Sequence, residues 1–153
     1  LNGLSEAEFL QKLESVFQFS EKPFQTPKAS KEVGLYIGGK WYGLQFKNVT
    51  SHTGKLADNL DVQLLQSFVL KPMLGIDDPR TSNRISFVGG IRGTAELEKM
   101  VDSGAYACAF SMFPTQISEV MDIADQGEIM PPKSTWFEPK LRDGMFIYRY
   151  PNA

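Results

Sequence analysis

The chain has 153 residues, of which 42% are apolar and 22% charged, and its formal net charge is −2. This size and apolar content suit a single domain with its own core. The charge counts against a protein that binds nucleic acid through a basic surface. No apolar run reaches the length of a membrane-spanning helix, so we expect no membrane partner.

The beginning of the chain suggests how it relates to a larger protein. Residues 1–17 have the pattern of an amphipathic helix with acidic residues, which is not the pattern of a signal peptide. A sequence that begins with Leu1 rather than Met looks like a piece of something longer. We therefore expect residues 1–153 to be one domain, the C-terminal fragment of a longer cytoplasmic protein.

The first half of the chain predicts a helix, a hairpin and a second helix. Ser5 starts a capping box, which predicts a helix over about 6–17. Gly38-Gly39 suits a tight two-residue turn, and the flanking apolar residues alternate, so residues 34–47 predict a β-hairpin. Leucines at helical spacing then predict a helix over about 60–69.

The second half predicts strand, helix, strand, helix, loop and strand in that order. The expected elements are a strand at 85–88, a helix from Thr94 to Gly104, a strand at 106–113, a helix from Thr115 to Gly127, and a strand at 145–150. Together with the earlier elements, this order predicts an α+β or α/β domain. Its core would be a mixed β-sheet with about four helices packed on it.

Two apolar patterns predict what these later elements bury. The run 106–113 predicts a buried strand, and Cys108 within it a buried thiol. In the following helix, the spacing of Ile117, Val120 and Met121 predicts that they face the core. Cys108 is the only cysteine and the chain has one histidine, so a structural zinc site is not expected.

A glycine-rich stretch, residues 87–94 (FVGGIRGT), joins an expected strand to an expected helix. Gly89 and Gly90 would let the backbone approach a ligand. Arg92 would add positive charge beside the free N–H groups at the helix N-terminus. The stretch is neither a dinucleotide-binding motif nor a Walker motif, so its spacing alone favours the alternative, a tight strand-to-helix turn that needs small residues.

A charged cluster precedes that stretch. Asp77 and Asp78 are followed closely by Arg80 and Arg84, and guanidinium groups bind phosphate or carboxylate with two aligned donors. Paired carboxylates can hold Mg²⁺ or act as acid and base. We expect no bound metal, and these two aspartates are the nearest approach to a metal pair. The alternative is that they cap a turn and pair with the arginines.

Residues 128–142 (EIMPPKSTWFEPKLR) predict a rigid loop that holds a ligand. Two adjacent prolines restrict the backbone before a run of polar side chains. The candidate ligand residues are Lys133, Ser134, Thr135, Glu138 and Lys140. Structural roles compete with this interpretation: Lys133 can pair with a carboxylate, Thr135 can cap a helix, and the two aromatic residues that follow can anchor the loop in the core.

Three stretches resemble the C-terminal region of the bacterial and archaeal proteins grouped as domain of unknown function 1015. They are 59–66 (NLDVQLLQ), 74–93 (LGIDDPRTSNRISFVGGIRG) and 128–144 (EIMPPKSTWFEPKLRDG). Members of this family carry an upstream Asp-Gly-His-His-Arg motif similar to the ParB and sulfiredoxin superfamily, which includes nucleotide-dependent small-metabolite kinases. The resemblance implies a site shared with that upstream region. It assigns no catalytic residue to this chain, whose sequence does not contain the motif.

These observations lead to one expectation and two alternatives. We expect the anion-binding part of a cytoplasmic enzyme, which takes a small phosphate or carboxylate ligand. A nucleotide-dependent small-metabolite phosphotransferase is the most specific form, on family analogy alone. The ligand residues would be Arg80, Arg84, Gly89, Gly90, Arg92, Lys133, Ser134, Thr135, Glu138 and Lys140. The alternatives are a non-catalytic domain that docks the N-terminal region of the same protein, and a ParB-like nucleic-acid-associated protein. The cofactor stays open.

Overall fold

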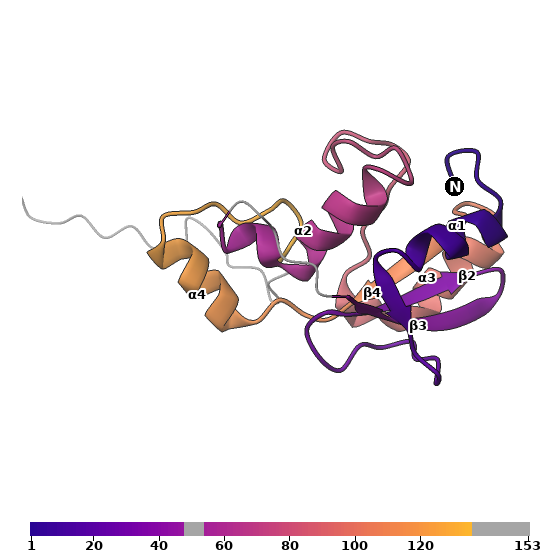
Figure 1. Ribbon diagram of the computed structural model, residues 1–153, viewed down its shortest axis with the longest axis horizontal. Helices are drawn as coiled ribbons and strands as arrows, with labels where there is room; N and C mark the ends of the chain where they lie inside the picture. Colours follow the sequence, from indigo (N-terminus) through magenta and orange to yellow (C-terminus); the bar gives the residue numbers. More distant parts are fainter. Residues whose placement is uncertain (48–53, 136–153) are drawn as a thin grey trace, which may run out of the picture.

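The computed structural model of the chain describes residues 1–47 and 54–135. Its strands are β1 (Phe17–Phe19), β2 (Glu32–Ile37), β3 (Lys40–Phe46) and β4 (Cys108–Met112), and its α-helices are α1 (Glu6–Leu13), α2 (Asp61–Leu65), α3 (Gly93–Asp102) and α4 (Ile117–Asp125). Short turns of other helix types are η1 (Ala57–Asn59), η2 (Gln66–Leu70, a π-helical turn) and η3 (Gly90–Arg92). Figure 1 shows the sheet at one end of the molecule and α4 at the other.

The four described strands form one sheet in the order β1-β3-β2-β4, and every neighbouring pair is antiparallel. The expected α+β domain with four α-helices is confirmed. Because these pairs are all antiparallel, the sheet is not the mixed sheet that an α/β arrangement would need. Gly38 and Gly39 have φ angles of +57° and +74°, so the predicted two-residue turn joins β2 to β3.

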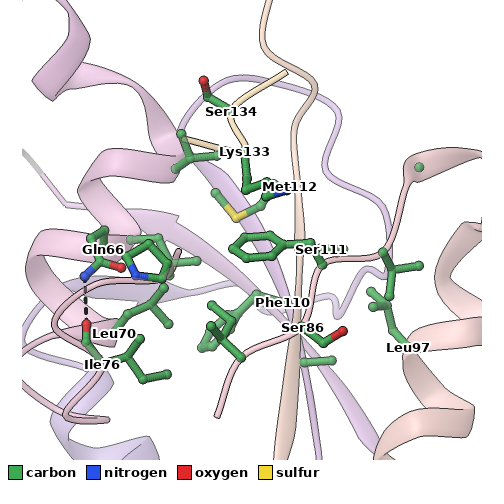
Figure 2. A pocket seen from close by; sticks show the side chains of 18 of the residues that line it. Gln66, Leu70, Ile76, Ser86, Leu97, Phe110, Ser111, Met112, Lys133 and Ser134 are labelled. Carbon is green, nitrogen blue, oxygen red and sulfur yellow. Dashed lines mark hydrogen bonds between the residues drawn. The ribbon is translucent and has the colours of Figure 1, made fainter. Parts of the chain in front are cut away.

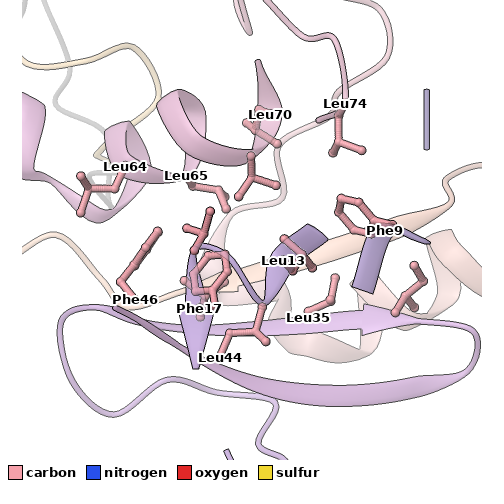
Figure 3. Packing of buried hydrophobic residues seen from close by; sticks show 14 of the residues in the cluster. Phe9, Leu13, Phe17, Leu35, Leu44, Phe46, Leu64, Leu65, Leu70 and Leu74 are labelled. Atoms are coloured by element: carbon pink, nitrogen blue, oxygen red, sulfur yellow. The ribbon is translucent and has the colours of Figure 1, made fainter. Parts of the chain in front are cut away.

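The main core lies on one face of the sheet, beneath α1 and α2 (Figure 3). Alternate β2 residues Val33, Leu35 and Ile37 point into it and are fully or almost fully buried. Phe9 and Leu13 of α1 meet them there. The Ser5–Glu8 capping box is present as predicted. However, α1 ends at Leu13, short of the expected residue 17, because the chain then turns into β1.

The opposite face of the sheet carries α3, so helices lie on both sides of the strands. Tyr36 Oη donates a hydrogen bond to Asp102 at 2.9 Å, and Trp41 Nε1 donates to Glu98 at 2.7 Å. The loop before β2 crosses this face too. A Cβ atom at Gly43 would lie 2.4 Å from the ring of Phe24, so glycine is needed there for the loop to pack closely.

The expected strand at 85–88 is wrong, because these residues are irregular and pair with no strand in the described parts of the chain. The helix that follows begins at Gly93, and Thr94 does not cap it. Instead, the Thr94 hydroxyl donates to the side-chain oxygen of Gln25 at 3.2 Å. The strand predicted for 106–113 is present over Cys108–Met112, but its residues, Cys108 included, are half-buried rather than buried, because no described strand covers its outer edge. The strand expected at 145–150 falls outside the described residues.

The side of α4 that packs against the rest of the protein differs from the side that its apolar pattern predicted. Ile123 is its buried residue and packs with Ala57 and Leu60, whereas Ile117 and Met121 are 65% and 59% exposed. An amphipathic pattern identifies an apolar stripe but not whether another element covers it. Over residues 1–47 and 54–135, none of the helices has the length and apolar character that crossing a bilayer requires.

Candidate functional site

A large apolar trough of about 1760 Å³ runs along β4 (Figure 2). We call it the β4 trough. The turn η2 and the segment after it form one wall, α3 lies on the other side, and Lys133 and Ser134 are drawn near Met112. Representative lining residues are Leu70, Ile76, Phe87, Leu97, Phe110 and Met112. Pockets for small ligands usually measure about 300–1,000 Å³, so this trough is larger than such a ligand needs.

One side of the trough is the open edge of β4, which pairs with β2 and with no other strand in the described chain. The two-residue turn makes Ile37 and Lys40 a hydrogen-bonded pair. Counting back from Ile37, the backbone N–H and C=O groups of successive β2 residues point alternately toward β3 and toward β4. Tyr36 and Gly34 therefore bond toward β4, where they face Ala109 and Ser111. It follows that Cys108, Phe110 and Met112 direct their N–H and C=O groups away from β2, toward the trough.

Gln66 contributes a polar group to the trough wall that the sequence analysis did not single out. Its side-chain Nε2 donates to the carbonyls of Ile76 and Asp77 at 2.8 and 3.2 Å, which fixes the amide on the π-helical turn. Its Oε1 is buried and has no hydrogen-bond partner within the described chain. The sequence signal that could have identified Gln66 is its place among the buried residues Leu64, Leu65 and Val69, where an apolar residue is usual and a polar side chain needs a partner.

The charged cluster before the glycine-rich stretch is largely closed on itself. Arg80 makes a bidentate ion pair with Asp78, with Nη2–Oδ2 at 2.7 Å and Nε–Oδ1 at 3.0 Å. These hydrogen bonds lower the pKa of Asp78 to about 2 and raise that of Arg80. At neutral pH, Asp78 is thus ionised and its carboxylate is already bound to the guanidinium of Arg80. Among the described residues, the Arg84 guanidinium makes one long contact, 3.5 Å from Nη1 to the carbonyl of Gly75.

The described part of the loop that begins at Glu128 and carries Pro131 and Pro132, here called the proline-flanked loop, contains two of the predicted ligand residues in different settings. Ser134 is buried, its hydroxyl donates to the carbonyl of Pro131 at 2.6 Å, and its own carbonyl accepts from Thr115 Oγ1 at 2.7 Å. Lys133 lies in the left-handed region at φ +63°, which is costly for a residue other than glycine. Nothing in the described part of the chain pairs with its ammonium group, and Thr135 is exposed.

The trough brings together most of the residues predicted as ligands, although not all of them. Its lining includes Asp77, Asp78, Arg80, Arg84, Gly89, Gly90, Lys133, Ser134 and Thr135. Arg92 is exposed and does not line it, and Glu138 and Lys140 lie outside the described residues. Across residues 1–47 and 54–135, no three His, Cys, Asp or Glu side chains gather as a metal site would require. Arg84 and Lys133 are the lining cations that no described carboxylate neutralises.

No protein-family model, curated protein or solved structure matches this chain. The resemblance to the 1015 family therefore remains an expectation from the sequence motifs.

Proposed function

We propose that this chain is a docking domain whose β4 trough binds an extended polypeptide segment. The segment would add to the sheet as a strand beside β4. Main-chain hydrogen bonds would provide affinity, and the apolar walls would receive alternate side chains. The partner is therefore an extended segment in which apolar residues alternate.

The open edge of β4 is the observation that carries this proposal. Sheet edges are usually shielded by charged residues, proline, bulges or very short strands, because an unprotected edge pairs with other chains. The other edge strand, β1, has only three residues. By contrast, β4 has five residues, Cys-Ala-Phe-Ser-Met, with no charge and no proline. An edge without these devices is suited to accept a partner strand.

The surroundings of the edge support the same conclusion. Phe87 and Ile91 are 46% and 80% exposed beside the trough, and both line it. A covering strand would remove such side chains from water, which stabilises a complex by about 25 cal/mol per Å² of apolar surface. The Arg80–Asp78 pair also fits a docking domain better than an anion site, since its donors are already occupied.

Amide exchange tests this proposal directly, with the full chain alone and with 1 mM of a ten-residue peptide of alternating valine and threonine. The amides of Cys108, Phe110 and Met112 should be protected in at least one of these conditions, because an added strand accepts their hydrogen bonds. Ala109 and Ser111, which bond to β2, serve as internal references. If the three outward amides exchange freely with and without the peptide, the docking proposal is wrong.

A matched pair of substitutions sharpens the test. Met112→Ala and Met112→Pro both remove the side chain, but only the proline removes the N–H that points away from β2. Where a strand is docked, the proline variant should bind it about three- to tenfold more weakly than the alanine variant. Equal binding by the two variants would show that the backbone edge is not the contact.

A second candidate function is the binding of a small anion, as in a cytoplasmic nucleotide-dependent phosphotransferase. The observation in its favour is Lys133, which lines the trough at a strained φ angle and whose ammonium group has no ion-pair partner among residues 1–47 and 54–135. Inorganic phosphate or Mg²⁺–ATP at 10 mM should then raise the melting temperature. The rise should vanish in Lys133→Ala and persist in Lys40→Ala, because Lys40 is an exposed lysine next to the β2–β3 turn that does not line the trough. No rise in the unmodified chain would dispose of this function.

A further inference from the structure

The occupant of the β4 trough can be named from this chain's own sequence. We propose that residues 145–150 (MFIYRY), which lie outside the described residues, form the strand that adds to β4. This inference rests on the proposed docking function and specifies its partner. The domain would carry its own ligand, and any external segment would have to displace it.

The composition of residues 145–150 matches what the trough requires. Phe146, Ile147, Tyr148 and Tyr150 are residue types enriched in strands. In an extended chain, Phe146 and Tyr148 point to one face and Ile147 to the other. One set would extend the face carrying Phe110 and Met112, which pack against the main core. The other would extend the face of Ala109 and Ser111. Residues from both faces of β4 line the trough.

The chain can reach the edge without strain. Thr135, the last described residue before this segment, already lines the trough, and the carbonyl of Ser134 accepts a hydrogen bond from Thr115, shortly after the end of β4 at Met112. Nine residues, 136–144, separate Thr135 from the segment. An extended stretch of that length spans about 30 Å, and five strand residues span about 17 Å. The linker is long enough to place the segment along the whole of β4.

Tethering favours this segment over a separate partner. A segment joined by a short linker has an effective concentration in the millimolar range, whereas a second copy or another protein competes at its free concentration. A docked strand also satisfies the three outward-facing residues of β4, whose groups otherwise depend on water. A partner therefore has to bind substantially more tightly than residues 145–150 do before it gains the edge.

The test uses amide exchange in the full chain and a pair of double variants. Neighbouring strand residues point their N–H groups to opposite sides, so Ile147→Pro with Tyr148→Pro removes a bond to β4 in either register. Ile147→Ala with Tyr148→Ala is the matched control that keeps both N–H groups. In the unmodified chain, the amides of Cys108, Phe110 and Met112 should exchange as slowly as those of Ala109 and Ser111.

In the proline double variant, the three outward amides should exchange at least about tenfold faster than in the alanine control. A peptide of residues 141–153, added to the proline variant, should restore their protection. If these amides exchange freely in the unmodified chain but become protected when the valine–threonine peptide is added, the inference is refuted and the docking function stands. Protection that survives the proline variant would assign the edge to another segment, or to a second copy if it depends on concentration. Lack of protection under every condition would overturn both.

Discussion

Replacing Asp61 should loosen the wall of the β4 trough, because this residue holds α2 against the start of β2. Asp61 is 8% exposed, and its carboxylate accepts hydrogen bonds from the backbone N–H of Lys31 at 2.8 Å and the hydroxyl of Ser30 at 3.3 Å. It also pairs with Lys31 Nζ at 3.0 Å. Lys31 has a φ angle of +72°, so these bonds hold a residue in an unfavourable conformation.

The expected cost follows from how buried each bond is. A hydrogen bond from a buried N–H to a charged acceptor contributes about 1.5–3 kcal/mol, and its loss leaves the donor unsatisfied. The Lys31 side chain is 34% exposed, so its ion pair is partly screened and contributes at most about 1 kcal/mol. Asp61→Ala should therefore destabilise the fold by about 2–3 kcal/mol. Lys31→Met, which keeps the backbone bond, should cost about 1 kcal/mol or less.

Urea denaturation followed by near-ultraviolet circular dichroism measures these differences as changes in the free energy of unfolding. Asp61→Asn should fall between the other two variants, since the amide oxygen still accepts from Lys31 but carries no charge. In thermal melts, Asp61→Ala should lower the midpoint by about 5–10 °C. If Asp61→Ala costs no more than Lys31→Met, the backbone bond contributes nothing and the reasoning is wrong.

Two further predictions concern titrating groups. Arg80→Gln should return the pKa of Asp78 from about 2 toward 3.8, as measured by carboxyl NMR titration. Because the ion pair lowers this pKa, the stability that the pair contributes is present above about pH 4 and is lost as the pH falls toward 2. An unchanged Asp78 pKa would mean that the guanidinium is not its partner in solution. Cys108 is half-buried, and desolvation raises the pKa of its thiol to about 11. Iodoacetamide should therefore alkylate it slowly up to about pH 9 in the folded chain and rapidly in urea, and equal rates in the two states would contradict this desolvation.

Elements specified by neighbouring residues were predictable from the sequence. The Ser5–Glu8 capping box and the Gly38-Gly39 turn are short-range signals, and both are present in the structure. The segment 85–88 was not predictable in this way. Its composition suits a strand, but a strand exists only where another strand pairs with it, and none of the described strands lies there.

The candidate site was predictable only in its composition. The sequence identified Arg80 and Lys133 as cations, and the structure places both on the trough lining. Whether a cation is available depends on its neighbours in space. Arg80 is occupied by Asp78, two residues earlier, and Lys133 has no partner in the described chain. The open edge of β4 had no signal in the sequence, because strand order depends on long-range pairing that local patterns do not contain.

The polar residues at the start of the proline-flanked loop explain why this stretch resembled a ligand site. The carboxylate of Glu128 accepts hydrogen bonds from the backbone N–H groups of Leu56 and Ala57 at 3.1 and 2.9 Å. Ser134 and Thr115 join the far end of the loop to the residues before α4. The polar side chains of Glu128 and Ser134 thus bind backbone groups of the protein itself. The hydrogen bond from Thr115 to Ser134 fixes the end of the loop close to the residues that follow β4, so Ser134 and Thr135 lie on the lining of the trough that we propose as a docking site.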